Sequence, residues 1–133
     1  MKETKVTFYN TNSKKIILTC EIAESYSEKM RGLMYRPSLP DDRGMLFPFL
    51  FPGNRLIWMK NVNFPLDLIF VNRKLEIIWI KEADIDRGIF NKIYWSHGFC
   101  KYIIETNKGF CKKFSIKKGD KIKIKKRENK LLD

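Results

Sequence analysis

Long apolar runs are missing from this sequence of 133 residues. A membrane-spanning helix needs roughly 18 consecutive apolar residues, and prolines, a glycine and a lysine interrupt the most apolar stretch, residues 45–60, well before that. We therefore expect no membrane span. The first ten residues also lack the apolar segment of a signal peptide, which predicts a cytoplasmic location for the chain as it stands.

Cysteine and histidine are scarce. The chain has three cysteines and one histidine, and no two cysteines have the Cys-x-x-Cys spacing. An odd count without such a pair favours free thiols in a reducing compartment over a disulfide framework. His97, Cys100 and Cys111 are the nearest approach to a zinc set, but the second half of a zinc motif is absent, so we predict no metal and no cofactor.

Standard catalytic motifs are absent as well. His97 has no serine or cysteine partner in a triad or dyad pattern, so the catalytic residues, if there are any, stay unknown. Glu82, Asp84 and Asp86 alternate and would share one face of a strand, yet they lack the glycine and glutamate positions of an EF-hand loop. We interpret them as a solvated acidic edge.

Basic residues outnumber acidic ones by 27 to 15, for a formal net charge of +12. Eleven basic and only three acidic residues lie within 108–133, so most of the excess charge belongs to the C-terminal part. The basic residues are mainly lysine, whereas bidentate phosphate and base contacts favour arginine. We expect at most weak, non-specific nucleic-acid binding and interpret most lysines as a solvated face.

The order of apolar and polar residues predicts a mainly β domain. Alternation and β-branched residues predict strands at 4–9, 15–23, 45–49, 55–60, 67–71, 75–81, 101–105 and 121–125. Turn residues predict that the first two strands, and 67–71 with 75–81, form hairpins. A capping box at Ser25 and Glu28 predicts one short helix near residues 25–35. We expect a surface loop at 82–99 and a helical turn at 110–114.

About eight short strands and one helix favour a compact, jelly-roll-like β-sandwich or a partly open barrel. The length fits a single domain, which we place at residues 1–126. Residues 127–133 are then a basic tail that we expect to fray. The oligomeric state is not predicted by any of these patterns.

Several ordered segments carry a family resemblance. They are Arg31-Gly32-Leu33-Met34 with Arg36 and Leu39, Gly44-Met45-Leu46-Phe47, Trp58-Met59-Lys60-Asn61, Pro65-Leu66-Asp67 with Phe70, Glu105 with Asn107 and Gly109, and Gly119-Asp120. Together they resemble the domain-of-unknown-function family 192 over about residues 6–124. The resemblance implies a jelly-roll-like β-sandwich and no assigned activity. Many members look exported, and Val62 and Phe64 replace the family's usual Thr and Ile.

A candidate site for a small ligand is centred on residues 58–67. Its proposed members are Arg36, Met45, Trp58, Met59, Lys60, Asn61, Asp67 and Glu105. A cation, an amide and carboxylates against apolar walls are typical of a small-ligand pocket, so the predicted function is small-molecule binding. A structural interpretation is also open, in which Asn61 and Asp67 bond turn backbone and Arg36 or Glu105 forms an ion pair between the helix end and a strand.

Two further functions stay open. In the first, the chain is an enzyme in which Asp67 or Glu105 is a general base and Lys60 stabilises negative charge. In the second, the basic C-terminus binds polyanions weakly. A binding site requires Arg36, Lys60, Asn61 and Asp67 to converge in one cleft, whereas the structural interpretation requires them to lie apart.

Overall fold

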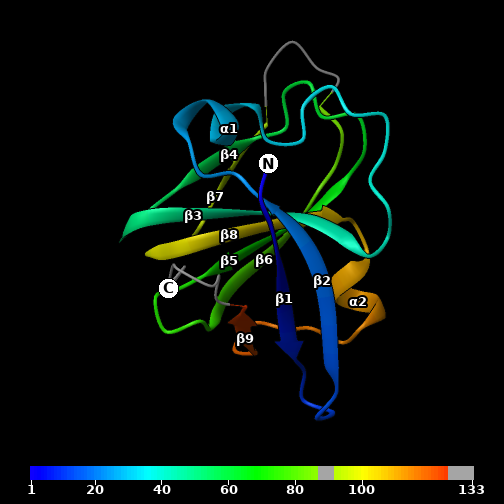
Figure 1. Cartoon of the computed structure of the whole chain (residues 1–133), viewed down its shortest axis with the longest axis vertical. Helices are drawn as coiled ribbons and strands as arrows, with labels where there is room; N and C mark the ends of the chain where they lie inside the picture. The colour runs from blue at the N-terminus through cyan, green and yellow to red at the C-terminus, as the bar shows by residue number, and fades with distance from the viewer. Residues whose placement is uncertain (87–91, 126–133) are drawn as a thin grey trace.

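Most of the chain forms one seven-stranded mixed sheet. The structure is a computed structural model that describes residues 1–86 and 92–125. The strand order is β6-β5-β8-β3-β2-β1-β9, and β4 and β7 form a separate two-stranded sheet (Figure 1). The elements are β1 Glu3–Tyr9, β2 Lys15–Ile22, α1 Tyr26–Arg31, β3 Arg43–Gly53, β4 Leu56–Trp58, β5 Leu66–Val71, β6 Ile77–Ala83, β7 Ile93–Trp95, β8 Cys100–Asn107, α2 Phe110–Lys113 and β9 Lys121–Ile124. The predicted mainly β fold class is confirmed.

The main sheet curls without closing into a barrel. The two predicted hairpins form, β1 with β2 and β5 with β6, and β3 pairs parallel to β2 after a crossover that contains α1. At the open edges the backbone N–H of Ile77 donates to the carbonyl oxygen of Asp120 at 2.9 Å. The N–H of Ile122 likewise donates to the carbonyl of Leu75 at 2.9 Å. These bonds bring β9 against the β5–β6 hairpin and bend the sheet around its core.

Helix α1 begins at the predicted capping box. The backbone N–H of Glu28 donates to Ser25 Oγ at 3.1 Å, and the N–H of Ser25 donates to Glu28 Oε1 at 3.0 Å. Backbone hydrogen bonds from Ser25 and Glu24 lower the pKa of the Glu28 carboxyl. The helix ends at Gly32, whose φ of 49° favours glycine, and this explains why it is shorter than the predicted 25–35.

Two apolar clusters cover the two faces of the main sheet. The first cluster contains Phe8, Leu18, Ile69, Ile104 and Phe110 among others. The second cluster contains Leu33, Met45, Phe47, Leu68 and Ile103 among others. Successive residues of a strand point to opposite faces, so neighbouring positions of β5 and β8 divide between the two clusters. By the same alternation, Asp67 shares the face of Ile69, and Glu105 shares the face of Ile103.

Gly44 lies where two strands leave no room for a side chain. An added Cβ would lie 2.7 Å from the backbone oxygen of Glu105 and 2.8 Å from Cδ2 of Leu18. We expect Gly44→Ala to lower the free energy of unfolding by about 2–3 kcal/mol, measured by urea denaturation. Gly53→Ala is the matched control, because its added Cβ meets only the flexible Arg55 side chain at 3.3 Å. Equal unfolding energies for the two variants would contradict this packing argument.

Besides the shorter helix, two further segments differ from the sequence-based prediction. The expected loop at 82–99 contains β7, which pairs with β4. The expected strand at 45–49 is the middle of the longer β3, which passes Pro48 and resumes its pairing at Gly53 after a register shift. Residues 87–91 and the expected tail at 127–133 lie outside the described residues. Within the part of the chain that the structure describes, no helix is long and apolar enough to cross a membrane.

Candidate functional site

A pocket of about 730 Å³ lies between α1 and the sheet face that carries the second cluster. Its interior is apolar and is formed by Leu33, Phe47, Phe49, Ile57, Val62 and Ile103. Its polar lining groups include Lys29, Arg31, Asn54, Arg55 and Glu105. We call this hollow the α1 pocket. Its volume falls within the range of small-molecule sites, and a few polar groups in an apolar lining are typical of them.

Glu105 is the buried polar group of the α1 pocket. It lies on β8 between Met45 of β3 and Leu68 of β5, and only 6% of its surface is exposed. Gly32 passes close to it, since a Cβ added there would lie 3.9 Å from Glu105 Oε1. No hydrogen bond or ion pair reaches this carboxyl from residues 1–86 or 92–125. Burial disfavours the charged form and raises the pKa of Glu105 to about 8, so the carboxyl is mainly neutral at pH 7.

Two cations flank one aromatic ring at the pocket. Lys29 Nζ lies 4.9 Å from the centroid of the Phe49 ring, and Arg55 Cζ lies 4.1 Å from it. The pKa of Lys29 is lowered, first by burial and then by the charge of Arg55, against an opposing effect of Glu24. This part of the α1 pocket therefore concentrates positive charge beside an apolar interior.

Arg55 has an unsatisfied donor. Its guanidinium donates to the carbonyl oxygen of Phe51, but its Nε is buried and has no hydrogen-bond partner among the described residues. A buried donor without a partner costs about 1–3 kcal/mol. An acceptor group from outside the chain would remove this cost.

Four of the sequence-predicted site residues lie at or beside the α1 pocket. Glu105 and Trp58 line it, and Met45 is the cross-strand neighbour of Glu105. Met59 is almost completely buried in the second cluster. Trp58 is 38% exposed, so it forms part of the rim.

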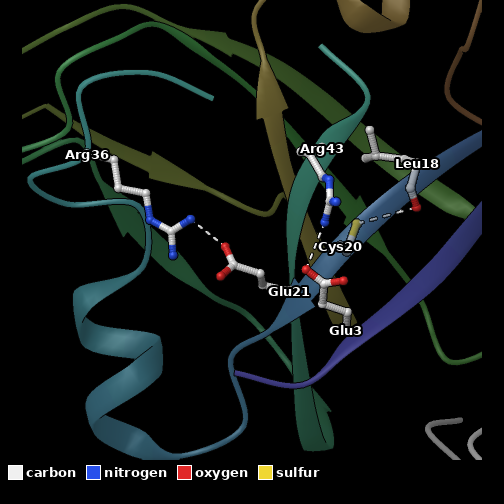
Figure 2. Close-up of polar contacts among 6 residues, drawn as sticks. All are labelled: Glu3, Leu18, Cys20, Glu21, Arg36 and Arg43. Carbon is white, nitrogen blue, oxygen red and sulfur yellow. Dashed lines mark hydrogen bonds and ion pairs between the residues drawn. The ribbon is translucent and has the colours of Figure 1, made fainter. Parts of the chain in front are cut away.

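The side chains of the other predicted members make separate contacts. Arg36 forms an ion pair with Glu21 of β2 (Figure 2), as the structural interpretation of that residue predicted. The Asn61 amide donates to Tyr35 Oη at 2.8 Å. Lys60 is exposed, and its Nζ lies 5.2 Å from the Trp58 ring centroid. The structure does not bring these side chains into one cleft.

Asp67 bonds the backbone at the start of α2. Its Oδ2 accepts the N–H of Cys111 at 2.9 Å and its Oδ1 accepts the N–H of Gly109 at 3.3 Å. It is 1% exposed and projects from the sheet face opposite to Glu105. Asp67 is thus held in backbone bonds and Lys60 lies over the Trp58 ring, so an acid–base arrangement of Asp67 or Glu105 with Lys60 is not the function that we propose.

Two of the alternating acidic residues of 82–86 pair with lysines. Lys108 Nζ lies 2.8 Å from Asp84 Oδ1 and holds the pKa of Asp84 low, and Lys112 Nζ lies 3.2 Å from Glu82 Oε1. Over residues 1–86 and 92–125, no three histidine, cysteine or acidic side chains are grouped as metal ligands.

The three cysteines are free and buried. Cys111 belongs to the first cluster and Cys100 to the second, on opposite faces of the sheet, so the zinc set with His97 does not assemble. Burial raises the pKa of the Cys20 thiol to about 12. These thiols pack as small apolar groups.

Sequence reasoning missed the residues from α1 and from the β3–β4 connection. In the sequence, Lys29 and Arg55 contributed only to the net positive charge and were not proposed as site residues, although each neighbours an apolar or aromatic segment. Met30, Leu33 and Met34 have helical spacing, which in a short helix is typical of its core-facing side. All three line the α1 pocket, and Leu33 also belongs to the second cluster. The signal in the sequence was this apolar stripe directly after Lys29, which could have indicated a pocket with a cation at its edge.

The fold and the pocket define a class of small, mainly β domains with a hollow between a curved sheet and a short helix. The chain belongs to the domain-of-unknown-function family 192 (DUF192), whose description is "Uncharacterized ACR" and whose family profile matches residues 7–124. The resemblance noted in the sequence is thereby confirmed.

Two solved structures are similar to the chain. One, from Sinorhizobium meliloti 1021, is described as a candidate transcription regulator; it has a TM-score of 0.86 and 30% identity, with 92% of this chain and 94% of that chain covered. The other, a protein of unknown function from Novosphingobium aromaticivorans, has a TM-score of 0.80 and 29% identity, with 90% and 83% covered. Among curated proteins, none matches the chain.

Proposed function

We propose that this protein binds a small organic acid with an apolar body in the α1 pocket. The observation that carries the proposal is the pair of cations, Lys29 and Arg55, on the same Phe49 ring at an apolar pocket. Burial first, and then repulsion by the charge of Arg55, lower the pKa of Lys29. A carboxylate or phosphate bound beside both cations would relieve this repulsion.

The apolar interior supports a ligand with a hydrocarbon or aromatic body. Burial of apolar surface contributes roughly 25 cal/mol per Å², so a body of eight to ten carbons would supply most of the affinity. At pH 7 the neutral carboxyl of Glu105 would donate a hydrogen bond to an uncharged ligand oxygen. The predicted site near residues 58–67 contributes Trp58 and Val62 to this proposal.

Decanoate and decanol at pH 7 are suitable probes, because they have alkyl groups of similar length but only decanoate is charged. We expect decanoate to raise the melting temperature by at least about 3 °C near saturation and decanol to raise it less. Lys29→Gln should weaken decanoate binding roughly tenfold and leave decanol unchanged. The matched control is Lys60→Gln, an exposed lysine that does not line the α1 pocket. Equal losses in the two variants, or no binding of either probe, would contradict the proposal.

Polyanion binding is a second candidate function, supported by a row of lysines on β9. Lys121, Lys123 and Lys125 are exposed, while the intervening Ile122 and Ile124 are buried, so the three lysines share one face. That face continues onto β1, where the backbone carbonyl oxygen of Lys5 accepts the N–H of Lys125. The description of the Sinorhizobium relative as a candidate transcription regulator makes DNA the polyanion to test.

We expect DNA binding to be non-specific, on the order of 0.1 mM at physiological salt, and to fall steeply as salt is raised. Replacing Lys121, Lys123 and Lys125 with Gln should weaken it further in a gel-shift titration. Sub-micromolar, sequence-dependent binding that survives these changes at about 200 mM salt would make nucleic-acid recognition the leading function instead.

A further inference from the structure

Exposed apolar side chains gather at one end of the main sheet. Leu50 and Phe51 near the end of β3 are 82% and 71% exposed, and Phe99 just before β8 is 66% exposed. Leu56 of β4 and Trp95 of β7 are exposed beside them. We call these five residues the apolar end. In Figure 1 it lies at the left, where β3 ends and β8 begins. Single exposed apolar residues are ordinary, but a contiguous set marks an interaction surface.

Strand pairing makes the apolar end contiguous. Gly53 is the register partner of Cys100, which brings the end of β3 beside Phe99, and Leu56 is the partner of Trp95. The backbone N–H of Ser96 donates to the carbonyl oxygen of Arg55 at 3.0 Å, and Arg55 in turn donates to Phe51.

The last part of β3 leaves its regular pairing. It pairs with β8 as far as Pro48 and resumes that pairing only at Gly53, after a register shift. Leu50 and Phe51 lie within this irregular stretch, and both are more than two-thirds exposed. Two adjacent apolar side chains that the protein leaves uncovered can enter the headgroup boundary of a bilayer together.

The charges that border the apolar end are mainly positive. Arg73 and Lys74, in the turn between β5 and β6, share a shallow hollow with Pro52 and Phe99. Glu76 also borders this hollow, and its carboxylate accepts a hydrogen bond from the Asn72 amide. Arg55, whose guanidinium donates to the carbonyl oxygen of Phe51, adds a further cation. An apolar tip with flanking cations is complementary to an anionic membrane surface.

We propose that the apolar end docks on the surface of an anionic lipid bilayer. Leu50, Phe51 and Phe99 enter the boundary between headgroups and acyl chains, and Arg73 and Lys74 contact anionic headgroups. Trp95 lies at the interface, which aromatic rings with a polar atom prefer. This surface goes beyond the proposed ligand site, because of its five residues only Leu56 also lines the α1 pocket.

Sedimentation with sucrose-loaded vesicles tests the proposal. We expect the full chain to sediment with vesicles of phosphatidylcholine and phosphatidylglycerol at 7:3, and much less with phosphatidylcholine alone. The double variant Leu50→Ser/Phe51→Ser should lower the partition coefficient at least about tenfold. Ile17→Ser is the matched control, since Ile17 is 56% exposed on the distant β2 strand, and it should sediment like wild type. Arg73→Gln/Lys74→Gln should weaken binding to the mixed vesicles by roughly fivefold per charge.

Phe99→Ser serves as an independent variant if the double variant does not fold, and should itself lower sedimentation. Sedimentation unchanged by both sets of serine substitutions would overturn the proposal, because it would show adsorption through lysines alone. Loss of sedimentation in Ile17→Ser to the same degree would overturn it too. Concentration-dependent dimerisation that Leu50→Ser/Phe51→Ser abolishes, without vesicle binding by the wild type, would assign the apolar end to a second copy of the chain.

Discussion

Glu105→Gln is expected to make the protein more stable at pH 8.5 and to change its stability little at pH 5. The carboxyl has an ordinary pKa of 4.5 and a folded-state pKa of about 8. Between these values the unfolded chain gives up its proton while the folded chain keeps it, so wild-type stability falls as pH rises through this window. The full effect is at most about 5 kcal/mol, and glutamine, which cannot ionise, avoids it.

Thermal unfolding of both proteins from pH 5 to pH 8.5 measures this effect. The melting temperature of wild type should fall relative to that of Glu105→Gln as pH rises, with a final difference on the order of 10 °C. Glu3→Gln is the control, because Glu3 forms a half-exposed ion pair with Arg43 (Figure 2). This variant should have the same dependence of melting temperature on pH as the wild type. Parallel curves for wild type and Glu105→Gln would show that the buried carboxyl is ionised throughout.

Asp67→Ala is expected to lower the free energy of unfolding by about 2–4 kcal/mol. The change leaves the N–H groups of Gly109 and Cys111 without their acceptor in a buried position. Phe110 and Cys111 of α2 pack in the first cluster, so loosening this turn also weakens the core. Asp67→Asn should cost less, about 1–3 kcal/mol, because its amide oxygen still accepts one of the two bonds.

Urea denaturation at pH 7 measures these losses, and Asp41→Ala at an exposed aspartate is the control, with an expected change within about 0.5 kcal/mol. Decanoate binding should survive in Asp67→Asn, because Asp67 lies on the sheet face away from the α1 pocket. A variant with normal stability and lost decanoate binding would place Asp67 in the ligand site and contradict our assignment.

Local patterns predicted the hairpins and the capped helix correctly, because alternation and caps act over a few residues. The strand β7 was missed because it has only three residues, two of which, Ile93 and Trp95, are exposed. Its partner β4 lies far away in the sequence, and no alternation marks such a short pair. The full length of β3 was not predicted either, because the strand continues past Pro48 only through a register shift with β8.

The candidate site was predictable only in part. Glu105 and Trp58 were named from the sequence because a carboxylate and a large aromatic ring stand among apolar neighbours. The sequence did not identify Lys29 and Arg55, the cations of the α1 pocket. They lie near the same Phe49 ring only because the crossover after β2 places α1 against β3. Asn61 and Asp67 were proposed as site residues because they are polar residues at turns. Polar side chains at turns commonly bond nearby backbone or side chains, and the structure shows that both do so.

The central claim is that the α1 pocket holds the apolar body of an organic acid. Nuclear magnetic resonance of methyl-labelled protein during titration with decanoate tests it most directly, because each methyl reports its own position. The account predicts that the methyl signals of Leu33, Val62 and Ile103, which line the pocket, shift with one common saturation curve. Ile17 on the outside of β2 should not shift. A shift of Ile17 without shifts of the pocket methyls, or no shift at millimolar decanoate, would contradict it.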